Sequence, residues 1–153
     1  MYTNFLFIHS WLRWLVIVFL VVLLFKFTYS LWQKKLYTKF DRVLSSVLLG
    51  SVHLQLLLGL ILYFALSPTV QAGLSNMQVT MKNHTLRYWT VEHVLSMIVF
   101  AGLVQVGFSL SKRAQESAQK HKLMLVYTLI GFIILMATIP WPFMSYGRPL
   151  FQL

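Results

Sequence analysis

The feature that most constrains the fold of this chain is a set of four apolar stretches. As α-helices, each would be about as long as a bilayer is thick. They run at about 4–25, 43–66, 89–110 and 124–139. An α-helix rises about 1.5 Å per residue, so roughly 20 apolar residues cross the hydrocarbon of a membrane. With 58% hydrophobic and 10% charged residues, the chain lacks the polar surface of a soluble domain. We therefore predict an all-α, integral membrane four-helix bundle in a single domain.

The basic residues lie unevenly between the predicted connections. Nine of them fall in the first and third connections, 26–42 and 112–122, whereas only Lys82, Arg87 and Arg148 fall on the opposite side. The positive-inside rule then predicts that the basic loops face the cytoplasm and that both termini lie outside, as in a bacterial cytoplasmic (inner) membrane protein. The formal net charge of +10 is therefore interpreted as a topology signal with an attraction to anionic lipid. We expect no nucleic-acid partner.

The connections differ in character. The segment 112–122 looks like a continuation of the flanking helices rather than a flexible linker. The connection 67–88 contains Pro68, Gly73 and polar residues, and we predict a loop there. Pro140 and Pro142 are expected to end the last helix.

Several kinds of active site are excluded. The chain has no cysteine, which rules out disulfides, thiolate metal sites and covalent c-type haem attachment. It also lacks a phosphate-binding glycine loop, a nucleophile elbow and an HExxH motif. Whether the protein is an enzyme stays open, and a functional site has to come from polar residues within the helices.

Ionisable side chains inside hydrocarbon cost about 2.5–3.5 kcal/mol each on insertion scales, so each needs a reason. Those in or at the ends of the predicted helices are His9, Arg13, His53, Glu92, His93 and His121. His9 and His93 each lie a few residues inside the same end of the bundle, at nearly equal depth. This pair is placed to ligate one metal ion or haem iron between two helices. His53 lies near the membrane centre and His121 near the inner surface, so pairing them would require the helix boundaries to shift.

Arg13 follows His9 by four positions and shares its helix face. It is placed to meet a haem propionate, and equally to form a buried ion pair with Glu92 on the third helix. Both interpretations stay open, and they are compatible.

Four segments resemble the small four-helix membrane b-type cytochromes, including short bacterial proteins labelled cytochrome b. They are HSWLRWLV, SVHLQLLLGLILY, VEHVLSM and KHKLMLVYTLIGF, and the resemblance covers nearly the whole chain. It implies that paired histidines from different helices hold haem b, and that electrons pass between quinol and a partner redox protein.

The resemblance also implies roles for individual residues. The candidate haem ligands are His9, His53, His93 and His121, and Arg13 is a candidate propionate partner. One haem on the outer side, bound by His9 and His93, agrees with the predicted depths, whereas a second haem at His53 and His121 does not. Glu92 has no counterpart in that family.

Two other functions fit the same residues. The protein could handle protons or a metal ion without haem, through His9, Arg13, Glu92 and His93. It could instead be an accessory subunit whose buried polar residues serve helix packing. Four short helices bury little interior, so we expect a homo-oligomer or a subunit of a membrane redox complex in every case.

Overall fold

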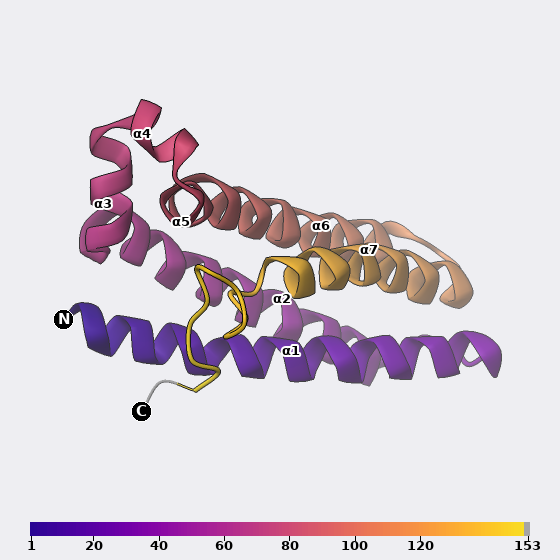
Figure 1. Ribbon diagram of the computed structural model, residues 1–153. Coiled ribbons are helices and arrows are strands. Elements are labelled where there is room, and N and C mark those ends of the chain that lie inside the picture. Colours follow the sequence, from indigo (N-terminus) through magenta and orange to yellow (C-terminus); the bar gives the residue numbers. More distant parts are fainter. Residues whose placement is uncertain (152–153) are drawn as a thin grey trace.

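The computed structural model describes residues 1–151, and helices are the only regular secondary structure in that part of the chain (Figure 1). Four helical segments are long and apolar enough to cross a membrane, which confirms the predicted four-helix membrane bundle. They are α1 (Tyr2–Trp32), α2 (Lys39–Ile61) with the π-helical turn η1 (Leu62–Leu66), α5 (His84–Arg87) with the π-helical turn η2 (Tyr88–Glu92) and α6 (His93–Arg113), and α7 (Ser117–Thr138).

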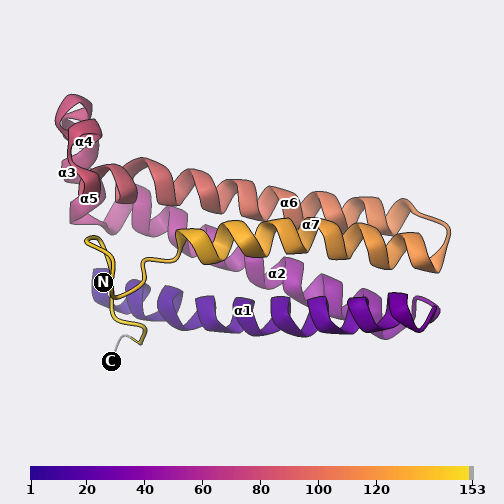
Figure 2. The same cartoon turned by 45° about the vertical axis from the view of Figure 1, so that its right-hand side comes forward.

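The four long helices form a ring in which α1 and α6 are not neighbours. Helix α1 packs against α2 and α7, and α6 packs against the same two helices. Helices α1 and α6 therefore occupy diagonally opposite corners. The N-terminus and residues 139–151 lie at one end of the bundle, here called the terminal end (Figures 1 and 2). The short connections 33–38 and 114–116 lie at the opposite end, here called the loop end.

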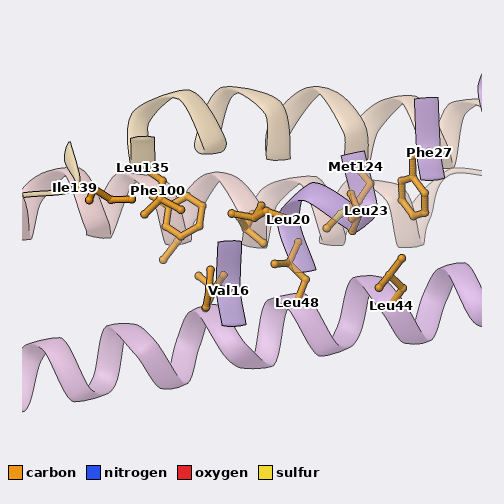
Figure 3. Close-up of a cluster of buried hydrophobic side chains, with 13 residues drawn as sticks. Val16, Leu20, Leu23, Phe27, Leu44, Leu48, Phe100, Met124, Leu135 and Ile139 are labelled. Carbon is orange, nitrogen blue, oxygen red and sulfur yellow. The ribbon is translucent and has the colours of Figure 1, made fainter. Parts of the chain in front are cut away.

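A single hydrophobic core runs along the middle of the bundle (Figure 3). Helix α1 contributes a stripe at spacings of three and four residues, which is one face of an α-helix. The core residues are Val16, Leu20, Leu23, Phe27, Leu44, Leu48, Val52, Phe100, Ala101, Val104, Met124, Leu135 and Ile139. Many other apolar side chains are exposed on the outside of the bundle, where a membrane protein meets lipid.

The helices extend further toward the loop end than the apolar stretches. Helix α1 continues to Trp32, and Lys34 then adopts the left-handed conformation (φ 51°) that commonly ends a helix. Helix α2 begins after Thr38, whose side chain forms a capping box with Asp41. Helix α7 starts at Ser117 rather than near 124, so the basic segment 112–122 is mostly helical.

The connection between the second and third spans is not the loop that we predicted. It contains α3 (Pro68–Ser75) and α4 (Met77–Lys82), which stand outside the bundle at the terminal end (Figures 1 and 2), and it leads into α5 at the start of the third span. Each short helix begins after a polar residue whose side chain accepts a hydrogen bond from the backbone three positions later. These residues are Ser67, Asn76 and Asn83. Such N-caps satisfy the first free N–H groups, which explains why helices form in a polar segment.

Candidate functional site

A cavity opens between the long helices at the terminal end. It holds about 1200 Å³ of empty space, part of it open to the surroundings. Most of its lining is apolar, which suits a ligand with a hydrophobic body. The titratable and amide side chains that line it include His9, Arg13, Gln55, His93 and Arg148. The two histidines that the sequence places at equal depth therefore reach one cavity, from diagonally opposite helices.

The His93 ring is held in one tautomer by two hydrogen bonds in series. The Tyr88 hydroxyl donates to the backbone carbonyl of Thr138 at 2.5 Å. A phenol hydroxyl has a single proton, which Tyr88 donates to Thr138. The same oxygen therefore acts as the acceptor for Nδ1 of His93, which lies 3.3 Å away. In the neutral imidazole, Nδ1 then carries the proton and Nε2 carries the lone pair. Nε2 has no hydrogen-bond partner among residues 1–151, and His93 lines the cavity.

The π-helical turn η2 makes this arrangement possible. Its widened winding bonds the backbone N–H of His93 to the carbonyl of Tyr88, five residues earlier. Side chains five positions apart diverge on a regular α-helix, where i and i+4 share a face. In η2 such pairs meet: Tyr88 contacts His93, and Arg87 contacts Glu92. Turns of this kind often occur at functional sites.

His9, on α1, lines the cavity and contacts Gln55 of α2. The Gln55 amide nitrogen donates to the His9 carbonyl at 3.0 Å and lies 3.3 Å from Nε2 of the same residue. Because an amide nitrogen has two protons, it can serve both acceptors. Nδ1 of His9 is then the protonated nitrogen, and it is buried without a hydrogen-bond partner among the described residues. The ring packs so close to Gly59 that an added Cβ would stand 3.1 Å from Cε1 of His9.

Two guanidinium groups line the cavity. Arg13 donates to the backbone carbonyl of Leu150 at 2.8 Å, and its Nε is buried without a partner in the described part of the chain. Arg148 donates to the Tyr2 hydroxyl at 3.1 Å and lies over the Trp89 ring at 4.2 Å. These partners are all neutral.

Glu92 does not pair with Arg13, contrary to one of the two sequence interpretations. Its carboxylate accepts a hydrogen bond from Arg87 at 2.6 Å, and Glu92 does not line the cavity. The cause is the π-helical turn, which brings Arg87 and Glu92 onto one side of the helix. Arg13, Glu92, His9 and His93 therefore do not form one cluster.

His53 lies on the outside of the bundle rather than among the helices. Its side chain is exposed, and Nδ1 donates to the Leu49 carbonyl of its own helix at 2.9 Å. Val52, one position earlier, faces the core instead. His53 therefore takes no part in the cavity.

His121 lies at the loop end, far from the cavity. It is fully buried between the rings of Phe27 and Tyr37, and Nε2 stands 3.6 Å from the Asp41 carboxylate. Asp41 is itself 1% exposed and pairs with Lys26. Because α7 starts earlier than predicted, His121 lies at a different depth from the predicted one. His53 faces away from the interior of the bundle, so the two histidines do not meet.

Sequence reasoning missed the site roles of Tyr88 and Arg148. Tyr88 precedes His93 by five residues, a spacing that predicts no contact on an α-helix. Arg148 follows the last predicted helix, so its position in the sequence indicates only a contribution to the charge distribution. A basic residue within an otherwise apolar and aromatic stretch, WPFMSYGRPL, was the one available signal for it.

The chain matches no protein-family model, no curated protein and no solved structure. Within residues 1–151, no three His, Cys, Asp or Glu side chains come together as a metal-binding group. The function has to be argued from the chemistry of the cavity.

Proposed function

We propose that this protein is a membrane electron carrier of the b-type cytochrome kind, in which His9 and His93 would hold one haem at the terminal end. The observation that carries the proposal is the state of His93. Nδ1 of His93 lies 3.3 Å from the Tyr88 hydroxyl, and donation from Nδ1 would leave the lone pair on Nε2 of a residue that lines the cavity. Metal-ligating histidines usually have such a partner on the other nitrogen, which fixes the tautomer and raises the basicity of the ligand.

The donor set supports haem better than a bare metal ion. The cavity offers two imidazoles from opposite helices, and a haem iron already held by its macrocycle needs only axial ligands. Glu92, the carboxylate that a proton or metal site would use, is paired with Arg87 outside the cavity lining. Ligation through Nε2 of His9 would replace its hydrogen bond with Gln55. We do not propose a second haem, because His53 and His121 face different surroundings.

Haem b would supply a one-electron redox centre. The chain would supply the ligands, orient His93 through Tyr88 and exclude water with its apolar lining. Such contacts set the potential of a bound haem. Exchange of electrons with quinol or a partner redox protein belongs to this proposal. Reduction of the oxidised protein by a soluble quinol analogue, followed by its absorbance, tests that step.

An absorption spectrum of the purified protein tests haem binding. We expect a Soret band and a sharp band on reduction in the wild type, and loss of both in His93→Ala. His53→Ala is the matched control, because it removes a histidine that faces away from the cavity, and it should keep the spectrum. A wild-type protein from haem-producing cells with no Soret band would overturn the proposal.

A partner within the membrane is also proposed, from the position of His53. With Nδ1 bonded to Leu49, its Nε2 points outward with no partner among the described residues. A polar group facing hydrocarbon is costly, and a second copy or another subunit of a redox complex would cover it. The particle mass in mild detergent should exceed that of a monomer, and His53→Leu should reduce it. A monomer in both cases would contradict this.

A further inference from the structure

A groove with two cations lies on the outer face of α2, in its first turns at the loop end of the bundle. The side chains that line it are Lys39, Arg42, Val43, Ser46 and Val47. Residues at spacings of three and four share one face of an α-helix, so these five lie side by side. All five are exposed. Basic and apolar groups therefore meet on one free surface.

The two cations of the groove are not neutralised by the carboxylate that lies between them in the sequence. Asp41 turns inward, where its side chain is buried and pairs with Lys26 of α1. The Thr38 backbone N–H and hydroxyl also donate to this carboxylate, at 2.7 Å each. Within residues 1–151, the side chains of Lys39 and Arg42 form no hydrogen bond or ion pair. The groove therefore favours an anion.

The aromatic residues beside the groove indicate its depth in the membrane. Tyr29 and Trp32 are exposed in the last turn of α1, which the short connection 33–38 joins to the start of α2. Tyrosine and tryptophan gather where lipid headgroups meet hydrocarbon. Lys39 and Arg42 therefore lie at the depth of lipid phosphates, and the residues that follow them lie at the depth of acyl chains.

The same face of α2 continues from the cations as an open, largely apolar strip. Val43 and Val47 are 50% and 42% exposed. The Ser46 hydroxyl donates to the carbonyl of Arg42 at 2.8 Å, so its proton is already used within the helix. At Gly50 an added Cβ would meet nothing within 4 Å, so the glycine leaves the helix surface bare. An acyl chain can lie along such a strip.

We propose that this groove binds one anionic phospholipid, whose phosphate contacts Lys39 and Arg42. One of its acyl chains lies along α2 from Val43 to Gly50. A guanidinium donates a fork of hydrogen bonds that matches phosphate oxygens, and an ammonium adds a compact charge. The general attraction of a basic membrane surface does not need a groove, whereas a single bound lipid needs charge and an apolar strip together. The site is separate from the cavity and needs no haem.

The test measures the binding of single phospholipids to the purified, delipidated protein in mild detergent, by native mass spectrometry. The probes are dioleoyl phosphatidylglycerol, which is anionic, and dioleoyl phosphatidylcholine, which has the same chains and no net charge. We expect the wild type to bind one phosphatidylglycerol at least about tenfold more tightly than phosphatidylcholine, the effect of two basic residues near a lipid surface. The variant Lys39→Gln/Arg42→Gln should lose about tenfold in affinity for phosphatidylglycerol and stay within about twofold for phosphatidylcholine.

The matched control is Lys112→Gln/Arg113→Gln. It removes two neighbouring, exposed cations from the last turn of α6, at the same end of the bundle but outside the groove. This variant should keep the preference of the wild type for the anionic lipid. Because binding is measured in detergent, an effect of the lost charges on membrane orientation does not enter.

A second variant tests the apolar strip and leaves both cations in place. Gly50→Leu should fold, since a side chain there meets open space and leucine favours a helix more than glycine does. Its side chain would occupy the path of the acyl chain. We expect about tenfold weaker binding of phosphatidylglycerol, the effect of about two methylene groups that are no longer buried. An unchanged affinity would overturn the proposed path of the chain.

Three other results would overturn the site. Equal affinity of the wild type for the two lipids would remove the role of charge. An equal loss in the groove variant and in the α6 control would mean that any cation at the loop end serves as well. Competition by glycerol 3-phosphate at the same concentration as the lipid would mean that the groove binds phosphate alone. The absence or presence of haem changes none of these results, so they are distinct from the test of the proposed function.

Discussion

At the scale of single residues, the site depends on one phenol oxygen. Tyr88 uses its proton on the Thr138 carbonyl and its lone pair on His93, so it links the start of α6 to the end of α7. The same ring stacks on Tyr146 of the C-terminal segment at 3.7 Å between centroids. The orientation of the proposed ligand is therefore coupled to two other parts of the fold.

Replacing Tyr88 by Phe should weaken haem binding without unfolding the protein. The ring and its stacking remain, but Nδ1–H of His93 loses its acceptor and the ring is free to turn. Loss of such a partner typically costs 10–100-fold, so we expect an affinity about tenfold or more below that of the wild type. Titration with haemin, followed by absorbance, measures it.

Tyr63→Phe is the matched control for this variant. The Tyr63 hydroxyl also belongs to the cavity lining, but it donates to the Thr90 carbonyl at 2.9 Å and contacts no histidine. It should leave the affinity within about twofold of the wild type, a change well below 1 kcal/mol. An equal loss in both variants would mean that Tyr88 has no special role.

At the scale of elements, regular helical geometry predicts most of the molecule and fails at η2. Hydrophobic length was enough for the four spans, because the cost of exposing backbone to lipid leaves helices as the only structure for such stretches. The common cavity of His9 and His93 followed from depth alone. The partners of Glu92 and His93 did not, because a π-helical turn changes which positions share a face. Nothing in the spacing of RYWTVEH marks that turn.

The α6–α7 hairpin depends on a close approach at Gly107. A Cβ at this position would stand 2.7 Å from Cβ of Tyr127, an atom that cannot move without the helix. Small residues at such contacts let membrane helices pack closely. Gly107→Ala should therefore push the helices apart and lower the free energy of unfolding by about 1–3 kcal/mol, the usual cost of overpacking.

The neighbouring glycine provides the control for that substitution. A Cβ at Gly102 meets nothing within 4 Å, so Gly102→Ala should leave stability unchanged or raise it by up to about 1 kcal/mol through helix propensity. Both variants are compared by the midpoint of unfolding in a titration with SDS. A larger loss in Gly102→Ala than in Gly107→Ala would contradict the packing argument.

At the scale of the whole molecule, the two ends of the bundle have different chemistry. The terminal end holds a cavity with two histidines and two arginines. The loop end instead holds an ion pair between the partly exposed Lys26 and the buried Asp41, beside His121. The apolar stretches do not predict this second cluster, because they place Asp41 in the connection 26–42. Only the longer helices of the structure bury its side chain.

The distribution of basic residues predicts which end of the bundle faces the cytoplasm. Nine of the basic residues belong to segments at the loop end, against Lys82, Arg87 and Arg148 at the terminal end. Such a bias predicts that the loop end lies in the cytoplasm, with the cavity and both termini on the far side of the membrane. A haem in the cavity would then exchange electrons near that far surface.

Single cysteines test this orientation directly, because the chain has none of its own. Gln78 on α4 and Gln115 between α6 and α7 are exposed and uncharged, so replacing either by Cys keeps the charge distribution. With a maleimide that does not cross membranes, we expect labelling of the Gln78→Cys protein in intact cells. The Gln115→Cys protein should react only after permeabilisation, and the cysteine-free parent in neither condition. The reverse pattern would place the cavity at the cytoplasmic surface, where electrons would have to come from a cytoplasmic donor instead.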